Sequence, residues 1–181
     1  MKKNLYYKTA LEGNVDFNER WRDMREILKL QPHDHVLDVG CAEGLISIEL
    51  AKKTKKVDAF DVEPHRINIA KQNANEANVG NINFTVSSYK YFNYSNYDCI
   101  FVLGVYHKIK DFSRTKALDK MFKKCSKSLY MRVPVVSEKV DSYVGVERKE
   151  IEDIAHANGF LIAHKGKPRT SHGTLYRFDR R

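Results

Sequence analysis

The sequence predicts an α/β fold with a doubly wound, mostly parallel sheet, and three observations lead to this prediction. The run 36–39 is apolar apart from one acid, which is typical of a strand buried on both faces. A turn almost without side chains, 40–44, follows it and passes at once into a helical pattern. A second β-like run, 57–62, comes next, so the chain alternates strands and helices as a parallel sheet requires.

Length and composition limit the possible functions. A chain of 181 residues is large enough to bury about 70% of its unfolded surface, and we expect one domain over 1–181. An excess of 32 basic over 23 acidic residues favours contact with a polyanion, although solvated helix faces also carry such charge. The three cysteines lack a C-x-x-C pair, and no apolar run has membrane-spanning length. We therefore expect free thiols, no membrane partner and a cytoplasmic location.

We expect one helix in the N-terminal part of the chain. Residues 1–16 lack periodicity, so we expect a flexible segment, with a flap over the ligand site as the alternative. Asp16 and Glu19 resemble a capping box that opens a leading helix over 17–30. The cluster His33-Asp34-His35 has no convincing third ligand nearby, so we expect a solvated loop there and no metal site.

The turn 40–44 and the acid Asp61 predict a nucleoside site. Backbone N–H groups can approach a ligand closely at a turn without side chains. The first two strands of a doubly wound sheet are neighbours, so Asp61 would end beside the turn. An acid at that place accepts hydrogen bonds from both hydroxyls of a ribose. The alternative is an ordinary tight turn with a solvated Asp61.

The spacing of this turn distinguishes two families. The dinucleotide fingerprint needs a third glycine where this chain has Leu45. The pattern G-x-A-x-G after an acidic strand instead resembles motif I of the class I S-adenosylmethionine (SAM) methyltransferases, and Ala42 departs from it by one methyl group. The resemblance implies a three-layer αβα sandwich of seven strands, with an antiparallel last strand beside the fifth. It also implies SAM as cofactor, bound by Asp38, Gly40, Cys41, Ala42, Gly44, Asp61 and Val62.

The next elements continue the alternation. We expect a helix over about 43–53, a helix opened by Pro64, and a strand over 82–86. After that strand the superfamily usually has an acid that bonds adenine, whereas this chain has Ser88, which we expect in the same contact. The region also contains a group of tyrosines that fits either an aromatic platform for a base or half-buried packing, at positions 89, 91, 94 and 97.

The loop after the fourth strand predicts the catalytic residues. The strand over 97–103 leads into Gly104-Val105-Tyr106-His107-Lys108, at the carboxyl end where ligands bind in α/β sheets. The loop resembles the superfamily's fourth motif in its L-x-V-L-H-H form, which places Leu103 and Gly104 against the sulfonium. His107 is the candidate base and Tyr106 a candidate substrate contact, and we expect both to be catalytic residues. The alternative is that His107 is a structural loop histidine.

The second half completes the sheet. We expect a helix with a buried stripe that includes Cys125 and with lysines on its other faces, then a strand over 128–133. A last helix ends at Gly159, and a closing hairpin pairs 160–163 with 174–178.

The sequence therefore predicts a SAM-dependent methyltransferase, which accelerates transfer mainly by aligning acceptor, methyl group and sulfur. The short connection 135–146 leaves no room for a lid, which favours a large acceptor such as RNA. Basic residues near the C-terminus point the same way, namely Lys165, Lys167, Arg169, Arg177, Arg180 and Arg181. The alternatives are O- or carboxyl-methylation of a small metabolite, and a SAM-binding or SAM-degrading protein without transferase activity.

Overall fold

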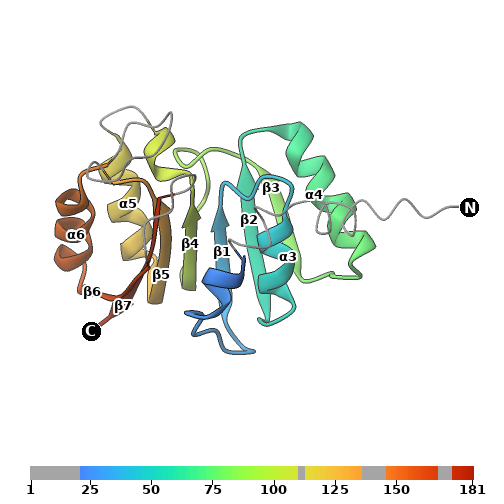
Figure 1. Ribbon diagram of the computed structural model, residues 1–181. Coiled ribbons are helices and arrows are strands. Elements are labelled where there is room, and N and C mark those ends of the chain that lie inside the picture. Colours follow the sequence, from blue (N-terminus) through green and yellow to red (C-terminus); the bar gives the residue numbers. More distant parts are fainter. Residues whose placement is uncertain (1–20, 110–112, 136–145, 167–172) are drawn as a thin grey trace, which may run out of the picture. The chain divides into compact units, whose positions relative to one another are not determined.

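The computed structural model describes residues 21–109, 113–135, 146–166 and 173–181. The chain divides into two compact units, residues 1–92 and 93–181. Figure 1 shows that each unit combines strands with helices, as an α/β fold requires.

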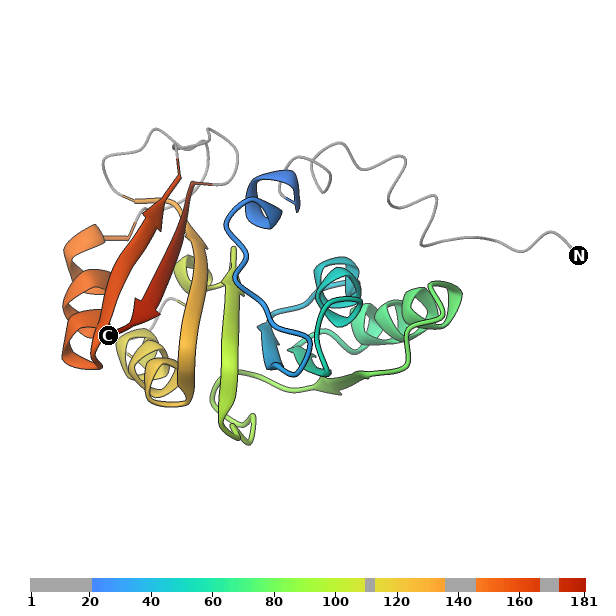
Figure 2. The same cartoon turned by 90° about the horizontal axis from the view of Figure 1, so that it is seen from below.

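The first unit is a three-stranded parallel sheet with helices on it. Its elements are β1 (His35–Val39), α3 (Leu45–Ala51), β2 (Lys56–Asp61), α4 (Pro64–Glu76) and β3 (Ile82–Val86). The strand order is β3-β2-β1, and all pairs are parallel. Figures 1 and 2 show α3 and α4 side by side against these strands.

Local sequence explains the elements of the first unit. The apolar residues of β1 are buried, as expected for a central strand that is covered on both faces. Pro64 is the first residue of α4, where its missing N–H is harmless. The buried face of α4 consists of Ile67, Ala70, Asn73 and Ala74. The small residues of this face allow α4 to lie close to the turn before α3.

The second unit is a mixed sheet. Its elements are β4 (Tyr97–Leu103), the 3₁₀ turn η1 (Tyr106–Lys108), α5 (Ser113–Lys123), β5 (Cys125–Val133), α6 (Arg148–Ala157), β6 (Phe160–Lys165) and β7 (Thr174–Arg180). The order is β4-β5-β7-β6, with β7 antiparallel to both of its neighbours. Its core is aromatic, because Phe122 contacts the rings of Phe160 and Phe178.

Most predicted elements agree with the structure, including the strands 82–86 and 97–103 and the closing hairpin. The leading helix differs, since the helical residues end at Arg25 rather than at 30. An i→i+3 turn follows, in which the N–H of Ile27 donates to the carbonyl of Met24 at 3.0 Å. The predicted segment 1–16 lies outside the described residues. The fifth strand begins at Cys125, which was expected on the preceding helix; a single turn residue at 124 separates α5 from β5.

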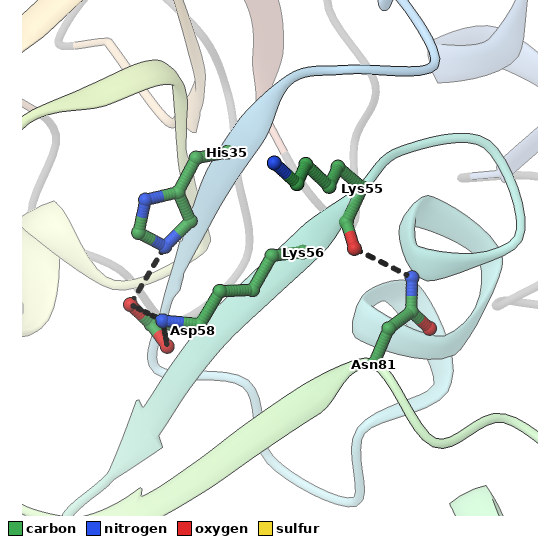
Figure 3. Close-up of polar contacts among 5 residues, drawn as sticks. All are labelled: His35, Lys55, Lys56, Asp58 and Asn81. Carbon is green, nitrogen blue, oxygen red and sulfur yellow. Dashed lines mark hydrogen bonds and ion pairs between the residues drawn. The ribbon is translucent and has the colours of Figure 1, made fainter.

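A polar cluster lies at the amino ends of β1 and β2 (Figure 3). The ring of His35 bonds the carboxylate of Asp58 at 2.8 Å, and the ammonium of Lys56 lies 3.2 Å from the same carboxylate. Asp34, next to His35, is fully buried and accepts the N–H of Gln31 at 2.7 Å. The expected solvated loop over 33–35 is therefore wrong for its last two residues, because Asp34 is buried and His35 is the first residue of β1.

Two further properties concern the cysteines and the length of the helices. All three cysteines are free and buried. Among the described residues, no helix combines the length and the apolar character needed to span a membrane.

Candidate functional site

The turn between β1 and α3 has an unusual backbone. Gly40, Ala42 and Gly44 all have positive φ, at 70°, 49° and 76°. This region disfavours residues with a Cβ, so Ala42 carries local strain that glycine would not. Such strain persists only where the surroundings fix the conformation, and it is frequent at ligand sites.

The amide groups of this turn are mostly used within the protein. The N–H groups of Gly40 and Cys41 both donate to the carbonyl of Phe60, at 2.8 and 3.0 Å. The N–H of Gly44 donates to the carbonyl of Cys41 at 2.9 Å. The carbonyl of Gly40 accepts no hydrogen bond within the described part of the chain, so the turn offers a ligand an acceptor at this point. The N–H groups of Gly40 and Cys41, which we expected to face a ligand, are therefore bonded to β2.

Helix α4 and strand β3 pack closely against the turn 40–44. A Cβ at Gly44 would lie 2.8 Å from the Cβ of Ala70 and 2.9 Å from the Cζ of Phe84. Asn73 is fully buried on α4, and its Nδ2 donates to the carbonyl of Glu43 at 2.8 Å. The sequence analysis missed Asn73, although an amide within the buried stripe of a helix is a signal for such a role. The packing around Gly44 and the bond from Asn73 therefore fix the conformation of the turn.

Asp61 connects the turn to the next strand. One carboxylate oxygen accepts the N–H of Ala42 at 3.0 Å, and the other accepts the N–H of Glu63 at 3.0 Å. Each carboxylate oxygen can accept a second bond, so both remain able to bind a ribose hydroxyl. Asp61 is largely buried, at 8% exposure, and its position beside the turn agrees with the prediction.

Apolar and polar groups next to Asp61 fit the base of a nucleoside. Val62 is 58% exposed and Val86 is 49% exposed, which is high for valine at the end of a sheet. Val86 is the register partner of Asp61, so the two exposed valines follow neighbouring strands. The hydroxyl of Ser88 is buried and has no hydrogen-bond partner among the described residues. A buried carboxylate beside apolar side chains and such a hydroxyl could hold the nucleoside part of SAM.

The side chain of Asp38 is buried inside the protein. It is 3% exposed, and the hydroxyl of Ser47 on α3 donates to it at 2.6 Å. Burial raises the pKa of Asp38 to about 6, opposed by the Ser47 bond and assisted by the charge of Asp61. Burial likewise raises the pKa of the Cys41 thiol, so this cysteine is no nucleophile at neutral pH.

The loop after β4 carries the predicted catalytic residues in the second unit. Gly104 has a φ of 73°, and its N–H donates to the carbonyl of Arg132 at 2.9 Å. His107 lies in η1, where burial first and the charge of Lys108 second lower its pKa to about 4. The ring of His107 is therefore neutral at pH 7, and it is a weaker base than an ordinary histidine.

Tyr106 has a different surrounding from the one expected of a substrate contact. It is 1% exposed, and its hydroxyl donates to Glu150 on α6 at 2.6 Å. Burial first and Glu150 second raise the pKa of Tyr106. Arg114 on α5 donates to the other oxygen of Glu150 at 2.8 Å. Neither Glu150 nor Arg114 carries a sequence signal for this cluster, because the contact depends on how α5 and α6 pack.

The basic residues and tyrosines that the sequence analysis considered as RNA contacts differ in exposure and in their partners. Arg177 is 9% exposed and pairs with Asp179 at 3.0 Å, and Arg180 donates to the carbonyl of Cys125 at 2.6 Å. Arg177 is thus paired inside the protein, whereas Arg180 is exposed but has this backbone partner, and Lys165 and Arg181 are exposed as well. Lys167 and Arg169 lie outside the described residues. Of the tyrosines, 94 and 97 are buried and 91 is 86% exposed.

Each unit thus gathers part of the predicted site. The first brings Asp61 to the turn 40–44, with Val62 next in the chain and Ser88 two residues after the register partner of Asp61, and it holds Asp38 buried on the strand before the turn. The second holds Leu103 and Gly104 at the end of β4, followed by η1 with Tyr106 and His107.

Comparison with known proteins finds methyltransferases that are similar to part of this chain. The chain is 45% identical over 49 residues to the probable cobalt-precorrin-6B C(15)-methyltransferase (decarboxylating) of Methanobrevibacter smithii, over 27% of this chain and 26% of that protein. It is 39% identical over 61 residues to an uncharacterized RNA methyltransferase of Oceanobacillus iheyensis, over 34% of this chain and 13% of that protein. The chain thus matches about a quarter or less of the length of these curated relatives.

A solved structure shows the same fold over the whole chain. Magnesium protoporphyrin IX methyltransferase from Synechocystis PCC 6803, with bound SAM, aligns with a TM-score of 0.72 at 20% identity. The alignment covers 100% of this chain and 86% of that chain. The predicted α/β sandwich of seven strands with an antiparallel last strand is therefore confirmed. A family model described as a methyltransferase domain matches residues 36–128, and the chain therefore belongs to the methyltransferase domain family.

Proposed function

We propose that this protein is a SAM-dependent methyltransferase that transfers a methyl group to RNA. The observation that carries the proposal is the pairing of Asp61 with the strained turn, through the bond from the N–H of Ala42. This geometry holds a carboxylate at the edge of a turn that a ligand can approach closely.

The residues of the first unit have defined roles in this proposal. Asp61 accepts the ribose hydroxyls, and Val62 with Ser88 binds the adenine. The carbonyl of Gly40 accepts the ammonium of the methionine end, and the buried negative charge of Asp38 favours that ammonium from behind the turn. Bound SAM supplies a methyl group made electrophilic by its sulfonium. The protein's main contribution is to align the acceptor with that methyl group.

The properties of His107 restrict the acceptor atom. A pKa of about 4 makes this ring too weak a base to deprotonate a hydroxyl efficiently near neutral pH. An acceptor with a free lone pair, such as a ring nitrogen of a base or an ionised carboxylate, needs no such deprotonation. Neutral His107 then accepts a hydrogen bond from the substrate.

The charge distribution favours RNA. Residues 93–181 contain 18 basic and 10 acidic side chains, whereas 1–92 contain 14 and 13. The net positive charge therefore belongs almost entirely to the unit that carries the acceptor loop, which suits a polyanionic substrate. The similarity to an uncharacterized RNA methyltransferase supports the same acceptor.

A small carboxylic acid is the second candidate. The weak basicity of His107 suits a carboxylate, and the aligned structure is that of a porphyrin methyltransferase. A SAM-binding or SAM-degrading protein without transferase activity is the third reading, because the first unit alone accounts for cofactor binding.

Transfer of labelled methyl groups distinguishes these readings. The protein is incubated with methyl-labelled SAM and a cell extract, which is then separated into RNA, protein, lipid and small-molecule fractions. Asp61→Ala tests whether label depends on the cofactor site. Glu63→Ala is the matched control, because it removes an exposed carboxylate two residues away.

Each outcome has a defined meaning. Label in RNA with the wild type and Glu63→Ala, but not with Asp61→Ala, supports the proposal. Label in the small-molecule fraction refutes the RNA acceptor and supports the second candidate. SAM binding without label in any fraction supports the protein without transferase activity.

A further inference from the structure

Arg114 is held in place beside the acceptor loop. Its Nη2 donates to Glu150 at 2.8 Å, and the guanidinium carbon lies 5.8 Å from the centre of the Tyr106 ring. Tyr106 is itself buried and bonded to the same carboxylate. The guanidinium is thus fixed on two sides, by an ion pair and by an aromatic face.

The guanidinium is only partly used by these contacts. It carries five N–H donors, and within the described part of the chain Glu150 and the hydroxyl of Tyr106 are its hydrogen-bond partners, so donors remain for a ligand. The side chain is 28% exposed, so solvent and ligands can reach the remaining donors. A fixed arginine with unbonded donors is a preorganised site for an oxyanion, since little further side-chain freedom is lost on binding.

Lys108 adds a second positive charge on the same connection. It is the last residue of η1, two positions after Tyr106, and it is exposed. Within the described residues it forms no ion pair. Arg114 contacts Tyr106, the first residue of the turn that ends in Lys108.

The other well-placed cations of this unit differ from these two. Arg177 and Arg180 are occupied by Asp179 and by the carbonyl of Cys125. On α6, Arg148 pairs with Glu152 through a contact on the helix surface. Arg114 is distinct because its partner fixes it next to η1, the turn that carries His107.

We propose that Arg114, assisted by Lys108, binds a backbone phosphate of the RNA acceptor next to His107. This inference rests on the proposed function and names how that site recognises its substrate. A guanidinium fork matches two oxygens of a phosphate. A carboxylate would match it equally well, but the excess of 18 basic over 10 acidic residues in this unit favours a polyanion. Glu150 acts as a positioning residue, because it touches Arg114 and Tyr106 rather than the substrate.

The test measures binding of a fluorescein-labelled, single-stranded RNA 12-mer of mixed sequence, by anisotropy over a series of salt concentrations. Arg114→Gln is expected to weaken binding about tenfold. It should also reduce the slope of log affinity against log salt by about 0.7, as loss of one phosphate contact with single-stranded RNA predicts. Arg114→Lys should keep the slope and lose part of the affinity, because it keeps the charge without the fork.

Controls separate this site from folding and from cofactor binding. Arg148→Gln removes an exposed arginine from the same unit and should change neither affinity nor slope. Lys108→Gln tests the site with an exposed residue whose replacement leaves the core intact, and it should lower the slope as well. Binding of S-adenosylhomocysteine and the melting temperature are measured for each variant.

The failure of this inference differs from the failure of the proposed function. If wild-type protein methylates and binds RNA but Arg114→Gln behaves like Arg148→Gln, the phosphate site is refuted and the function stands. If wild-type protein binds S-adenosylhomocysteine but not RNA, both the RNA acceptor and the site are refuted. If Arg114→Gln impairs transfer only into the small-molecule fraction, the site binds a carboxylate and the inference is overturned.

Discussion

Replacing Gly44 by alanine tests how tightly the cofactor turn is built. Gly44 has a φ of 76°, where a residue with a Cβ is disfavoured by about 1 to 2 kcal/mol. The new methyl group would also lie 2.8 Å from the Cβ of Ala70 and 2.9 Å from the ring of Phe84. Overpacking of this kind costs typically about 1 to 3 kcal/mol. We therefore expect Gly44→Ala to lower the free energy of unfolding by about 3 kcal/mol.

Two other glycines separate the contributions. Gly159 has a φ of 79° but open space around its missing Cβ, so Gly159→Ala should show the backbone contribution alone, about 1 to 2 kcal/mol. Gly80 has neither a positive φ nor a close neighbour, so Gly80→Ala should change stability by less than about 0.5 kcal/mol.

Urea unfolding of the three variants, followed by circular dichroism, measures these differences. For a chain of this length, about 3 kcal/mol corresponds to a fall in melting temperature of roughly 6 to 12 °C. The order of destabilisation should be Gly44→Ala, Gly159→Ala, Gly80→Ala. If Gly44→Ala is no more destabilising than Gly159→Ala, the turn has room for a side chain and the close packing behind it is refuted.

Three predictions concern pH. Burial would raise the pKa of Asp58, but the hydrogen bonds from His35 and Lys56 outweigh this effect and lower that pKa below 3.8. The contribution of Asp58 to stability is therefore present above pH 4 and is lost in more acidic solution, and thermal melts of Asp58→Asn should lack this loss. Asp38 has the opposite sign, because its pKa of about 6 lies above the ordinary 3.8, so wild type should gain roughly 2 to 3 kcal/mol between pH 7 and pH 4 relative to Asp38→Asn. If His107 accepts a proton during transfer, kcat/KM should fall only near pH 4; a fall near pH 6.5 that His107→Gln abolishes would contradict its lowered pKa.

Much of the fold could be predicted because the spacing of apolar residues and the positions of turn residues determine where its strands and helices lie. The run 36–39 and its turn fix the first strand and the helix that follows, and Pro64 marks the start of α4 where it was expected. The antiparallel β7 beside β5 was predicted from the resemblance to the superfamily rather than from the residues, and the register of the two strands confirms it.

The site was only partly predictable, for a physical reason. The position of Asp61 beside the turn follows from parallel neighbouring strands, so one sequence suffices to predict it. The partner of Tyr106 does not follow, because Glu150 lies 44 residues further along and meets it only through helix packing. The use of Gly40 and Cys41 N–H groups by Phe60 is likewise a result of how the turn closes against β2. Contacts made across packed elements leave no periodic pattern in a sequence.

The central claim is that the first unit binds SAM through Asp61, and calorimetric titration with SAM tests it most directly. Two ribose hydrogen bonds to a carboxylate are worth about 1.5 to 3 kcal/mol each, so Asp61→Ala should weaken binding at least about 100-fold. Glu63→Ala, which removes an exposed carboxylate two residues away, should bind as wild type does. A melting temperature for Asp61→Ala confirms that the variant is folded. Wild-type affinity in folded Asp61→Ala would contradict the account, because the ligand would then be held elsewhere.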